Sequence, residues 1–303
     1  MGIRGVWSTF RRSFTTIDPL ECPPYRIGID MFSLVYTHRV NLDELLELLL
    51  SWAAHGHTIT CVWDGTAPKE KKEIIGQRRT VRDTATEKKN DLETYLTDYK
   101  EQLSEADIQH INSAITSLSW QGWHMTGSIK RKIQDTLGPS ITHTFAPGEA
   151  DDILIDMTTS KTIDIVMSLD SDLFAMGAER IWRLLRVKGK WQLEDISVEA
   201  VCMSWKITLA QLQDACFLAG WDRCHLSTGG THMQFDMALN RIKHYRTYQN
   251  VLHRFPPAEP LEEGAIQRLL VLKKESKARW QHIIRDRISP EAPKTSSVAL
   301  DAN

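Results

Sequence analysis

Short apolar runs that each end in a carboxylate recur along this chain of 303 residues. Their β-branched and aromatic residues are typical of buried parallel strands. Parallel strands bring their carboxyl ends to one edge of a sheet, where ligands of open α/β folds bind. The clearest runs are RIGID, TITCVWD, THTFAPGE and IDIVMSLDSD. They predict an α/β fold whose acids collect at one sheet edge.

Acids in apolar surroundings need a positive charge beside them, because removing an ionised carboxylate from water costs several kcal/mol. The chain has no HExxH or CxxC motif that would indicate zinc. Carboxylate oxygens alone select a hard cation such as Mg²⁺, with Mn²⁺ as a substitute. Seven acids exceed the needs of one ion, so we expect two ions about 4 Å apart, as in phosphodiester hydrolysis. The candidate ligands are Asp30, Asp64, Glu149, Asp151, Asp170, Asp172 and Asp222.

The segments between these runs have the periodicity of helices, as expected in an α/β fold. NLDELLELLLSWAAHG leads from the Asp30 strand to the Asp64 strand and is stopped by Gly56, which makes a βαβ unit. Residues 69–132 are polar and helical, and we interpret them as an arch over the site. From Thr208 the pattern is helical. We therefore predict a central, mostly parallel twisted sheet flanked by helices, with a helical arch and a helical C-terminal half.

The length suits one large domain or two modest ones, and 42% apolar residues can form a core. We expect an N-terminal region over 1–132, which includes the arch. A second region over 133–290 would hold the remaining acids and a helical half. The segment 291–303 has no aromatic residue and is predicted to be a disordered tail.

Charge is distributed unevenly along the chain. The net charge is −2, but residues 69–89 carry eight Lys or Arg and four Asp or Glu, a net charge of +4. Nucleic acid is therefore a permitted partner. No signal peptide and no apolar run of membrane-spanning length is evident. We expect a monomer without membrane contact, inside the cell and in the nucleus rather than the cytoplasm.

With its acids in this order, the sequence resembles the flap endonuclease family of structure-specific 5′ nucleases, which has cellular and large-DNA-virus members. The resemblance runs from Met1 to about Arg246. It rests on MGIRGVW, IGIDMFSLVY, VWDGTAPKEKKEIIGQRR, APGEADD with SLDSDLFAMG, and DACFLAGWDRC. It implies a PIN-like nuclease fold, the seven acids as metal ligands, and N-terminal residues packed beside the active site. The region over 1–132 would then be an N-terminal nuclease region, and 133–290 an internal nuclease region with a helical DNA-binding half.

The resemblance also assigns residues to DNA. Lys71 and Arg78 would be the catalytic cations that reach the scissile phosphate. Their spacing of seven residues, close to two helical turns, puts both on one helix face. Tyr36 would stack on a base beside the cleaved bond. The expected DNA contacts are Gly2, Tyr36, Lys71, Arg78, Arg79, Gly229 and Gly230.

Two departures from the family pattern limit these expectations. Gly229 and Gly230 stand in LSTGGTHMQFDMAL without the basic pair that follows the family's duplex-binding turn. A monovalent ion at that turn is therefore left open. No glutamine-led clamp-binding box ending in two aromatic residues is present, so we expect no recruitment by a sliding clamp. Both departures fit a divergent member, such as one from a large DNA virus.

The resemblance implies a Mg²⁺-dependent 5′ flap endonuclease or 5′ exonuclease. Its substrate would be branched DNA with a 5′ single-stranded flap, in replication, repair or recombination. A gap or Holliday-junction nuclease would use the same chemistry, and the sequence leaves that choice open, as it does RNA cleavage. The alternative from another class is a nuclease-like protein that binds DNA or a repair partner without cutting.

Overall fold

The structure of this chain is a computed structural model that describes residues 2–67, 72–220, 233–256 and 264–288. Its contacts divide the chain into two compact units. Residues 18–156 form one unit, and residues 1–17 with 157–303 form the other. The functional division expected between 132 and 133 stays a prediction. The tail expected over 291–303 lies outside the described residues.

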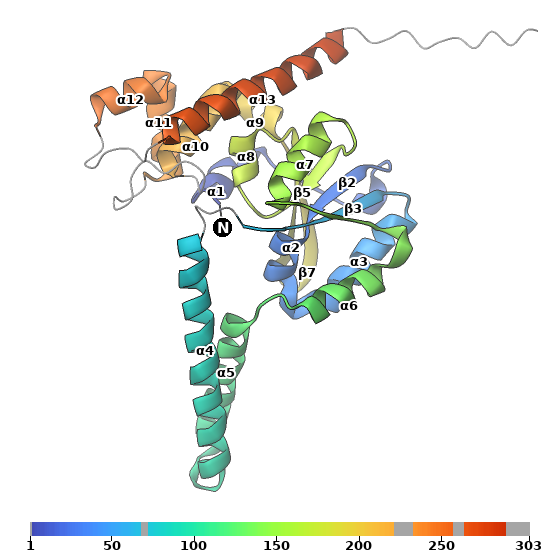
Figure 1. Cartoon of the computed structure of the whole chain (residues 1–303), viewed down its shortest axis with the longest axis vertical. Coiled ribbons are helices and arrows are strands. Elements are labelled where there is room, and N and C mark those ends of the chain that lie inside the picture. The colour runs from blue at the N-terminus through green and yellow to red at the C-terminus, as the bar shows by residue number, and fades with distance from the viewer. Residues whose placement is uncertain (1, 68–71, 221–232, 257–263, 289–303) are drawn as a thin grey trace, which may run out of the picture. The chain divides into compact units, whose positions relative to one another are not determined.

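Within the described part of the 18–156 unit, three parallel strands form a sheet (Figure 1). They are β2 (Arg26–Asp30), β3 (Thr58–Trp63) and β4 (Thr142–Phe145). β3 lies between the other two. Asp30 pairs with Val62, and Trp63 pairs with Phe145. The three carboxyl ends therefore meet at one edge, where the sequence pattern predicts the acids.

Helices accompany these strands, as the βαβ pattern predicts. They are α2 (Met31–His38), α3 (Leu42–Ala54), α6 (Gly127–Leu137) and α7 (Ala150–Thr159), with 3-10 turns η2 (Pro19–Glu21), η3 (Arg39–Asn41) and η6 (Gly138–Ser140). α3 is amphipathic and buries Leu45, Leu49 and Trp52. It ends ahead of Gly56, whose φ of 106° lies in the left-handed region that favours glycine.

A hairpin of two long helices interrupts this unit and projects from its α/β part (Figure 1). It consists of α4 (Lys72–Tyr99), η5 (Lys100–Gln102) and α5 (Glu105–Gly122). Ser104 caps α5 by accepting a hydrogen bond from the backbone N of Asp107 at 3.2 Å. The expected arch over 69–132 is thus shorter. Its last residues belong to α6, whose Lys132 forms an ion pair with Asp43 of α3 at 3.2 Å.

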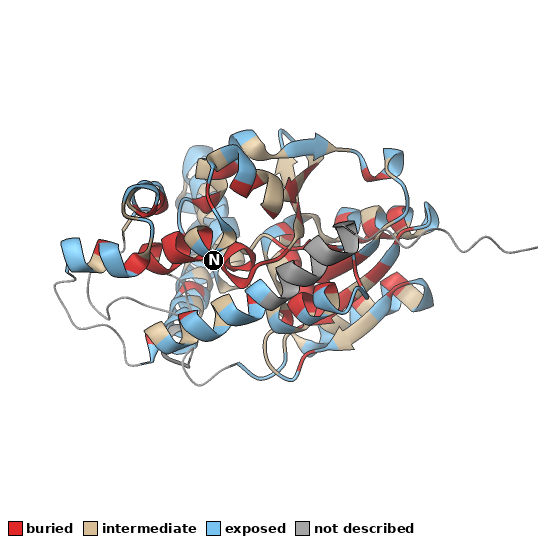
Figure 2. Cartoon of the chain, turned by 90° about the horizontal axis from the view of Figure 1, so that it is seen from above, coloured by how far each residue is buried: buried red, intermediate tan, exposed pale blue. Residues whose placement is uncertain are grey.

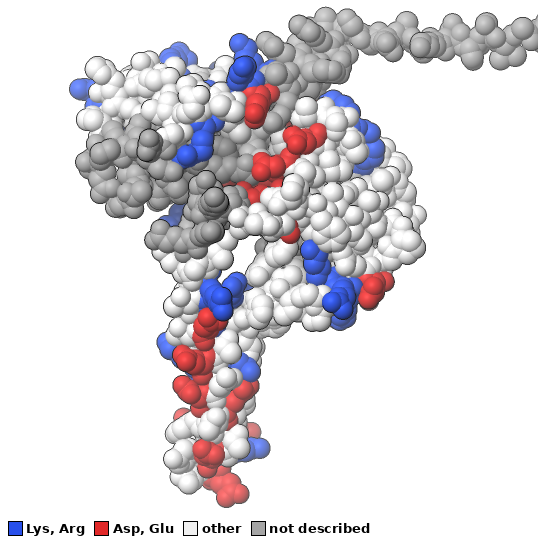
Figure 3. All heavy atoms as spheres, viewed as in Figure 1, with Lys and Arg blue, Asp and Glu red and all other residues white. Residues whose placement is uncertain are grey.

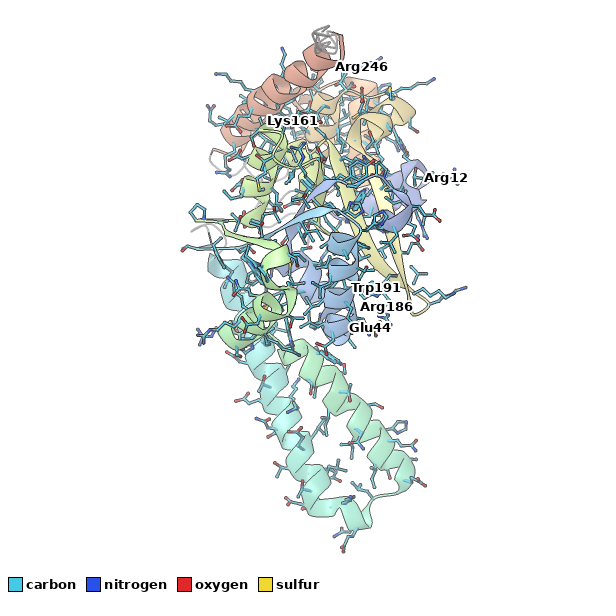
Figure 4. The ribbon with its side chains drawn as sticks, turned by 90° about the vertical axis from the view of Figure 1, so that its right-hand side faces the viewer. Arg12, Glu44, Lys161, Arg186, Trp191 and Arg246 are labelled. Atoms are coloured by element: carbon cyan, nitrogen blue, oxygen red, sulfur yellow. The ribbon has the colours of Figure 1, made fainter. Side chains whose placement is uncertain are left out.

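The other unit contains four strands among its described residues. They are β1 (Thr15–Ile17), β5 (Ile165–Met167), β6 (Arg180–Val187) and β7 (Lys190–Ser197). β5 and β6 are parallel, whereas β7 pairs antiparallel with both β6 and β1. Arg186 stacks on Trp191 near the β6–β7 turn, with 5.0 Å between the guanidinium carbon and the ring centre (Figure 4). The strands of this unit are therefore mixed in direction.

Helices make up the rest of this unit, which confirms the predicted helical C-terminal half. They are α1 (Val6–Phe10), α8 (Asp172–Met176), α9 (Val198–Trp205), α10 (Leu209–Ala219), α11 (Phe235–Tyr245), α12 (Tyr248–Arg254) and α13 (Ala265–Ile288), with the 3-10 turn η1 (Arg11–Ser13). The ring of Phe10 contacts those of Phe174, Trp205 and Phe235, with centres 5.3–5.7 Å apart.

Buried residues follow the strands and the helix faces turned toward them (Figure 2). Together with the strands and helices given above, this burial confirms the predicted α/β fold with flanking helices. No helix among the described residues combines the length and the apolar character needed to cross a bilayer.

Candidate active site

Two of the predicted ligands lie at the carboxyl edge of the β2–β3–β4 sheet. Asp30 ends β2, is 6% exposed, and caps α2 by accepting a hydrogen bond from Ser33 N at 3.0 Å. Asp64 follows β3 and accepts a hydrogen bond from Ala150 N at 2.7 Å. A carboxylate offers roughly four lone-pair sites, so accepting one backbone hydrogen bond does not by itself prevent it from ligating a cation.

The segment that carries Glu149 and Asp151 is fixed directly to Asp64. The backbone N of Gly65 donates to the carbonyl of Gly148 at 2.7 Å. A Cβ atom at Gly65 would lie only 2.0 Å from the carbonyl oxygen of Ala146, so this approach requires glycine. The side chains of Glu149 and Asp151 are both half-buried. Four of the seven predicted ligands thus belong to one sheet edge.

The next two predicted ligands lie in the other unit, in the turn after β5. Asp170 Oδ1 accepts a hydrogen bond from Asp172 N at 3.1 Å, and Asp172 is 3% exposed. Gly2 lies against this turn, because a Cβ there would be 2.3 Å from both Asp170 Oδ1 and Ser171 Oγ. Ser171 in turn donates to the carbonyl of Ile3 at 3.2 Å. The N-terminal residues therefore pack beside these acids, as the family resemblance implies.

The remaining predicted site residues divide into two groups. Arg78 and Arg79 lie on α4 and are exposed, and Arg79 is 3.7 Å from Asp83. Their role at the phosphate stays a prediction. The residues outside the described part of the chain are Lys71, Asp222, Gly229 and Gly230.

Tyr36 lies on α2 at the base of the helical hairpin. Its hydroxyl accepts a hydrogen bond from Met125 N at 3.3 Å, and its ring packs edge-on against Trp123 with centres 5.0 Å apart. These contacts give the side chain a structural role at the hairpin base. Stacking of Tyr36 on a DNA base stays a prediction.

Arg39 anchors the hairpin beside Tyr36, a role that the sequence analysis missed. Its guanidinium donates to the carbonyl oxygens of Tyr36 and Trp120. It also lies 5.9 Å from the ring centre of Trp120 and 6.0 Å from that of Trp123. The signal for this role was the tryptophan pair at the end of the longest periodic stretch.

The two ends of the hairpin carry opposite charge (Figure 3). Residues 72–90 contain six Lys or Arg and three Asp or Glu, a net charge of +3. Residues 91–107 contain six Asp or Glu and one Lys, a net charge of −5. Only the half nearer the sheet therefore favours the phosphates of a nucleic acid.

The donor set at these positions suits a hard cation, because it consists of carboxylate oxygens. Among the described residues, no group of three or more His, Cys, Asp or Glu side chains is arranged as a metal site. The seven-ligand cluster includes Asp222, which lies outside those residues. Ligation by all seven acids therefore stays a prediction.

Three cysteines among the described residues give no sign of thiol chemistry. Cys61, Cys202 and Cys216 are buried, and burial raises the pKa of Cys61 and of Cys202 to about 12. Such thiols stay protonated at neutral pH and are poor nucleophiles. These three side chains act as small apolar groups in the core.

Comparisons with known proteins match part of the sequence. Residues 140–222 match the family described as the XPG I-region. The chain is 30% identical over 193 residues to Flap endonuclease 1 of Nanoarchaeum equitans (strain Kin4-M), which covers 60% of this chain and 53% of that protein. The chain thus spans about half the length of that relative. The matched I-region contains five of the seven predicted ligands, namely Glu149, Asp151, Asp170, Asp172 and Asp222.

Two solved structures resemble the fold. The catalytic core of Rad2 in complex with a DNA substrate has a TM-score of 0.57 and 14% identity, covering 82% of this chain and 70% of that one. Human GEN1 in complex with Holliday junction DNA has a TM-score of 0.55 and 14% identity, and the match covers 92% of this chain and 63% of the GEN1 chain. These likenesses confirm the nuclease-like fold predicted from the sequence.

Proposed function

We propose that this chain, a divergent member of the flap endonuclease family, is a metal-dependent nuclease that cuts branched DNA near a 5′ single-stranded end. The observation that carries the proposal is the shared sheet edge of Asp30, Asp64 and the 149–151 segment. There, Ala150 N bonds to Asp64 at 2.7 Å. These residues occur in the family's order, and the I-region match includes the 149–151 segment.

Mg²⁺ fits this donor set, and Mn²⁺ can replace it. Two ions would be held by Asp30, Asp64, Glu149, Asp151, Asp170, Asp172 and Asp222. When bound, such ions make water acidic enough to attack a phosphodiester and stabilise the negative charge on its oxygens.

The chain's own residues fix the acids and supply positive charge. The bonds from Ser33 N and Ala150 N hold Asp30 and Asp64 in place before substrate arrives. Side chains that are preorganised in this way need little rearrangement during the reaction. Arg78 neutralises the phosphate from the basic half of the hairpin, and the family resemblance assigns the same role to Lys71, which lies outside the described residues. That half also holds the single strand through its phosphates.

The substrate is branched DNA with a 5′ flap, and the protein acts as a monomer in the cell, in the nucleus rather than the cytoplasm. The work belongs to DNA replication, repair or recombination. A gapped duplex, a four-way junction and a recessed 5′ end contain the same kind of phosphodiester bond in a different DNA geometry. Because the acids serve all of these substrates equally, DNA geometry has to be ranked by experiment.

The test is cleavage of 5′-labelled and 3′-labelled double-flap DNA, compared with a gapped duplex, a four-way junction and a recessed 5′ end. Each substrate is incubated with Mg²⁺, Mn²⁺ or EDTA. The key variant is Asp64→Asn, which keeps an oxygen for Ala150 N but removes the charge. Asp152→Asn is the control, because this neighbouring acid is exposed and outside the ligand set.

We expect the wild type and Asp152→Asn to cut near the junction with Mg²⁺ or Mn²⁺ and not with EDTA. We expect Asp64→Asn to be inactive. DNA binding by folded wild-type protein without cleavage in either metal would instead support a binding-only nuclease-like protein.

A further inference from the structure

A lysine is held between two aromatic rings at the same sheet edge, and the family motifs do not include it. Lys130 lies on α6, and its Nζ is 4.9 Å from the ring centre of Trp63 and 4.4 Å from that of Phe145. Both distances are within cation–π range. Trp63 is fully buried, whereas Phe145 is 55% exposed. The ammonium group therefore sits between a core ring and a surface ring.

The rings that hold Lys130 share one face of the sheet. Trp63 and Phe145 are paired in register, and His143 lies two residues before Phe145 on the same face. Trp63 Nε1 donates a hydrogen bond to His143 Nδ1 at 3.1 Å. Burial lowers the pKa of His143, which favours the neutral imidazole that this bond requires. The platform under Lys130 is thus fixed within the fold.

The charge of a predicted metal ligand also acts on Lys130. Burial lowers the pKa of Lys130, and the negative charge of Asp64 acts in the opposite direction by favouring the ammonium form. A lysine stem commonly extends its charged end into water. Here the charged end lies over the rings of Phe145 and of Trp63, the residue before Asp64 in the sequence. The Asp64 carboxylate itself accepts a hydrogen bond from Ala150 N through Oδ1.

We propose that Lys130 and Phe145 form a nucleotide-binding site for the DNA strand that is cut at this edge. The ammonium group of Lys130 binds a phosphate oxygen of that strand, and the exposed ring of Phe145 stacks on a base. This inference rests on the proposed nuclease function. Phosphate contacts and stacking are both tolerant of sequence, so the site would position DNA without selecting bases.

The sequence analysis overlooked both residues for identifiable reasons. Lys130 begins the basic run Lys-Arg-Lys on α6, which lies outside the basic segment at 69–89. Phe145 reads as the last residue of a buried strand, yet β4 leaves it exposed. Their proximity depends on how α6 places Lys130 beside Trp63 and Phe145, and helical periodicity does not specify that placement.

A matched pair of lysines on α6 makes the site testable. Lys130→Met keeps most of the aliphatic stem and removes the charge, whereas Lys130→Arg keeps the charge. Lys132→Met is the control, since Lys132 is exposed and forms its ion pair with Asp43 at 3.2 Å. Phe145→Leu removes the ring at an exposed position and is the variant least prone to misfold.

The experiment measures the Kd of each folded variant for fluorescent 5′-flap DNA in EDTA over a range of salt concentrations. We expect Lys130→Met to raise Kd about tenfold and to lower the slope of log K against log salt by about 1. Phe145→Leu should raise Kd about tenfold with an unchanged slope. Lys130→Arg and Lys132→Met should stay within about twofold of the wild type.

Cleavage by the wild type with Mg²⁺, measured in parallel, separates the two proposals. If the wild type cuts DNA but Lys130→Met and Phe145→Leu match it in Kd and salt slope, the binding site is wrong and the nuclease function stands. If folded wild-type protein neither binds nor cuts DNA, both proposals are wrong. A loss of affinity in Lys130→Met without a change of slope would indicate a packing role only.

Discussion

The carboxyl edge of the β2–β3–β4 sheet and the α4–α5 hairpin belong to one unit but are held by different forces. At the edge, acids are positioned by tertiary hydrogen bonds such as that from Ala150 N to Asp64. In the hairpin, α5 has no buried residue, and the cations of α4 are positioned by helical periodicity. The geometry of the edge is thus fixed by contacts between segments, whereas the hairpin presents exposed charges.

This difference separates the expected effects of substitutions. Changing an edge residue alters the geometry of the acids, because Asp64 is bonded to the backbone of the 149–151 segment and Asp30 caps α2. Changing an exposed hairpin residue alters charge and leaves the fold intact, since surface substitutions usually change stability by less than about 0.5 kcal/mol.

The largest effect is expected for the loss of an acid's charge at the edge, as in Asp64→Asn above and in Asp30→Asn. Asparagine still caps α2 through Ser33 N but removes the negative charge. Cleavage should fall on the order of a thousandfold or more, with little change in unfolding temperature. Asp30→Ala would also remove the cap and cost about 1 kcal/mol of stability. Single-turnover experiments measure the cleavage rate of each variant, and thermal unfolding measures its stability. Full activity of Asp30→Asn would contradict the role of Asp30 as a metal ligand.

In the hairpin, Arg78→Ala should lower the cleavage rate about a hundredfold, because the charge acts on the phosphate during the reaction. Arg79→Ala should weaken DNA binding only a few-fold, since Arg79 is exposed and paired with Asp83. Separate measurements of kcat and KM distinguish the two arginines. Equal losses in both variants would mean that the hairpin contributes only general positive charge.

Two glycines provide the sharpest structural contrast. A Cβ at Gly65 would be 2.0 Å from the carbonyl of Ala146, whereas one at Gly76 on α4 meets nothing within 4 Å. Gly65→Ala should therefore destabilise the protein by about 1–3 kcal/mol and slow cleavage. Gly76→Ala should stabilise α4 by about 0.5–1 kcal/mol. Chemical denaturation measures the free energy of unfolding of both variants. If both substitutions stabilised the protein, or both destabilised it, the contrast between the edge and the hairpin would be wrong.

The smallest effect is expected at the far end of the hairpin. Replacing Asp91, Glu93 and Asp98 by their amides should change cleavage by less than about threefold, because this acidic half does not favour DNA phosphates. A large gain in affinity would show instead that the strand reaches this end. A large loss would indicate a role that its charge does not predict.

Residue patterns predicted most of the sheet and much less of the hairpin. Asp30 ends β2 as expected, because the β-branched run RIGID is buried and only its register with β3 remained to be found. The turn at Ser104 was not predicted, since the periodic stretch from 91 to 120 continues through it. The contact of Gly2 with Asp170 joins residues far apart in sequence, and only the family resemblance anticipated it.

The most direct test of the account is the number of Mn²⁺ ions bound per chain, measured by electron paramagnetic resonance on wild type, Asp64→Asn and Asp152→Asn. The account predicts two saturable ions for the wild type and for Asp152→Asn, and fewer or weaker ions for Asp64→Asn. Wild-type protein that binds no Mn²⁺, or an Asp64→Asn variant that binds both ions as tightly as the wild type, would contradict it.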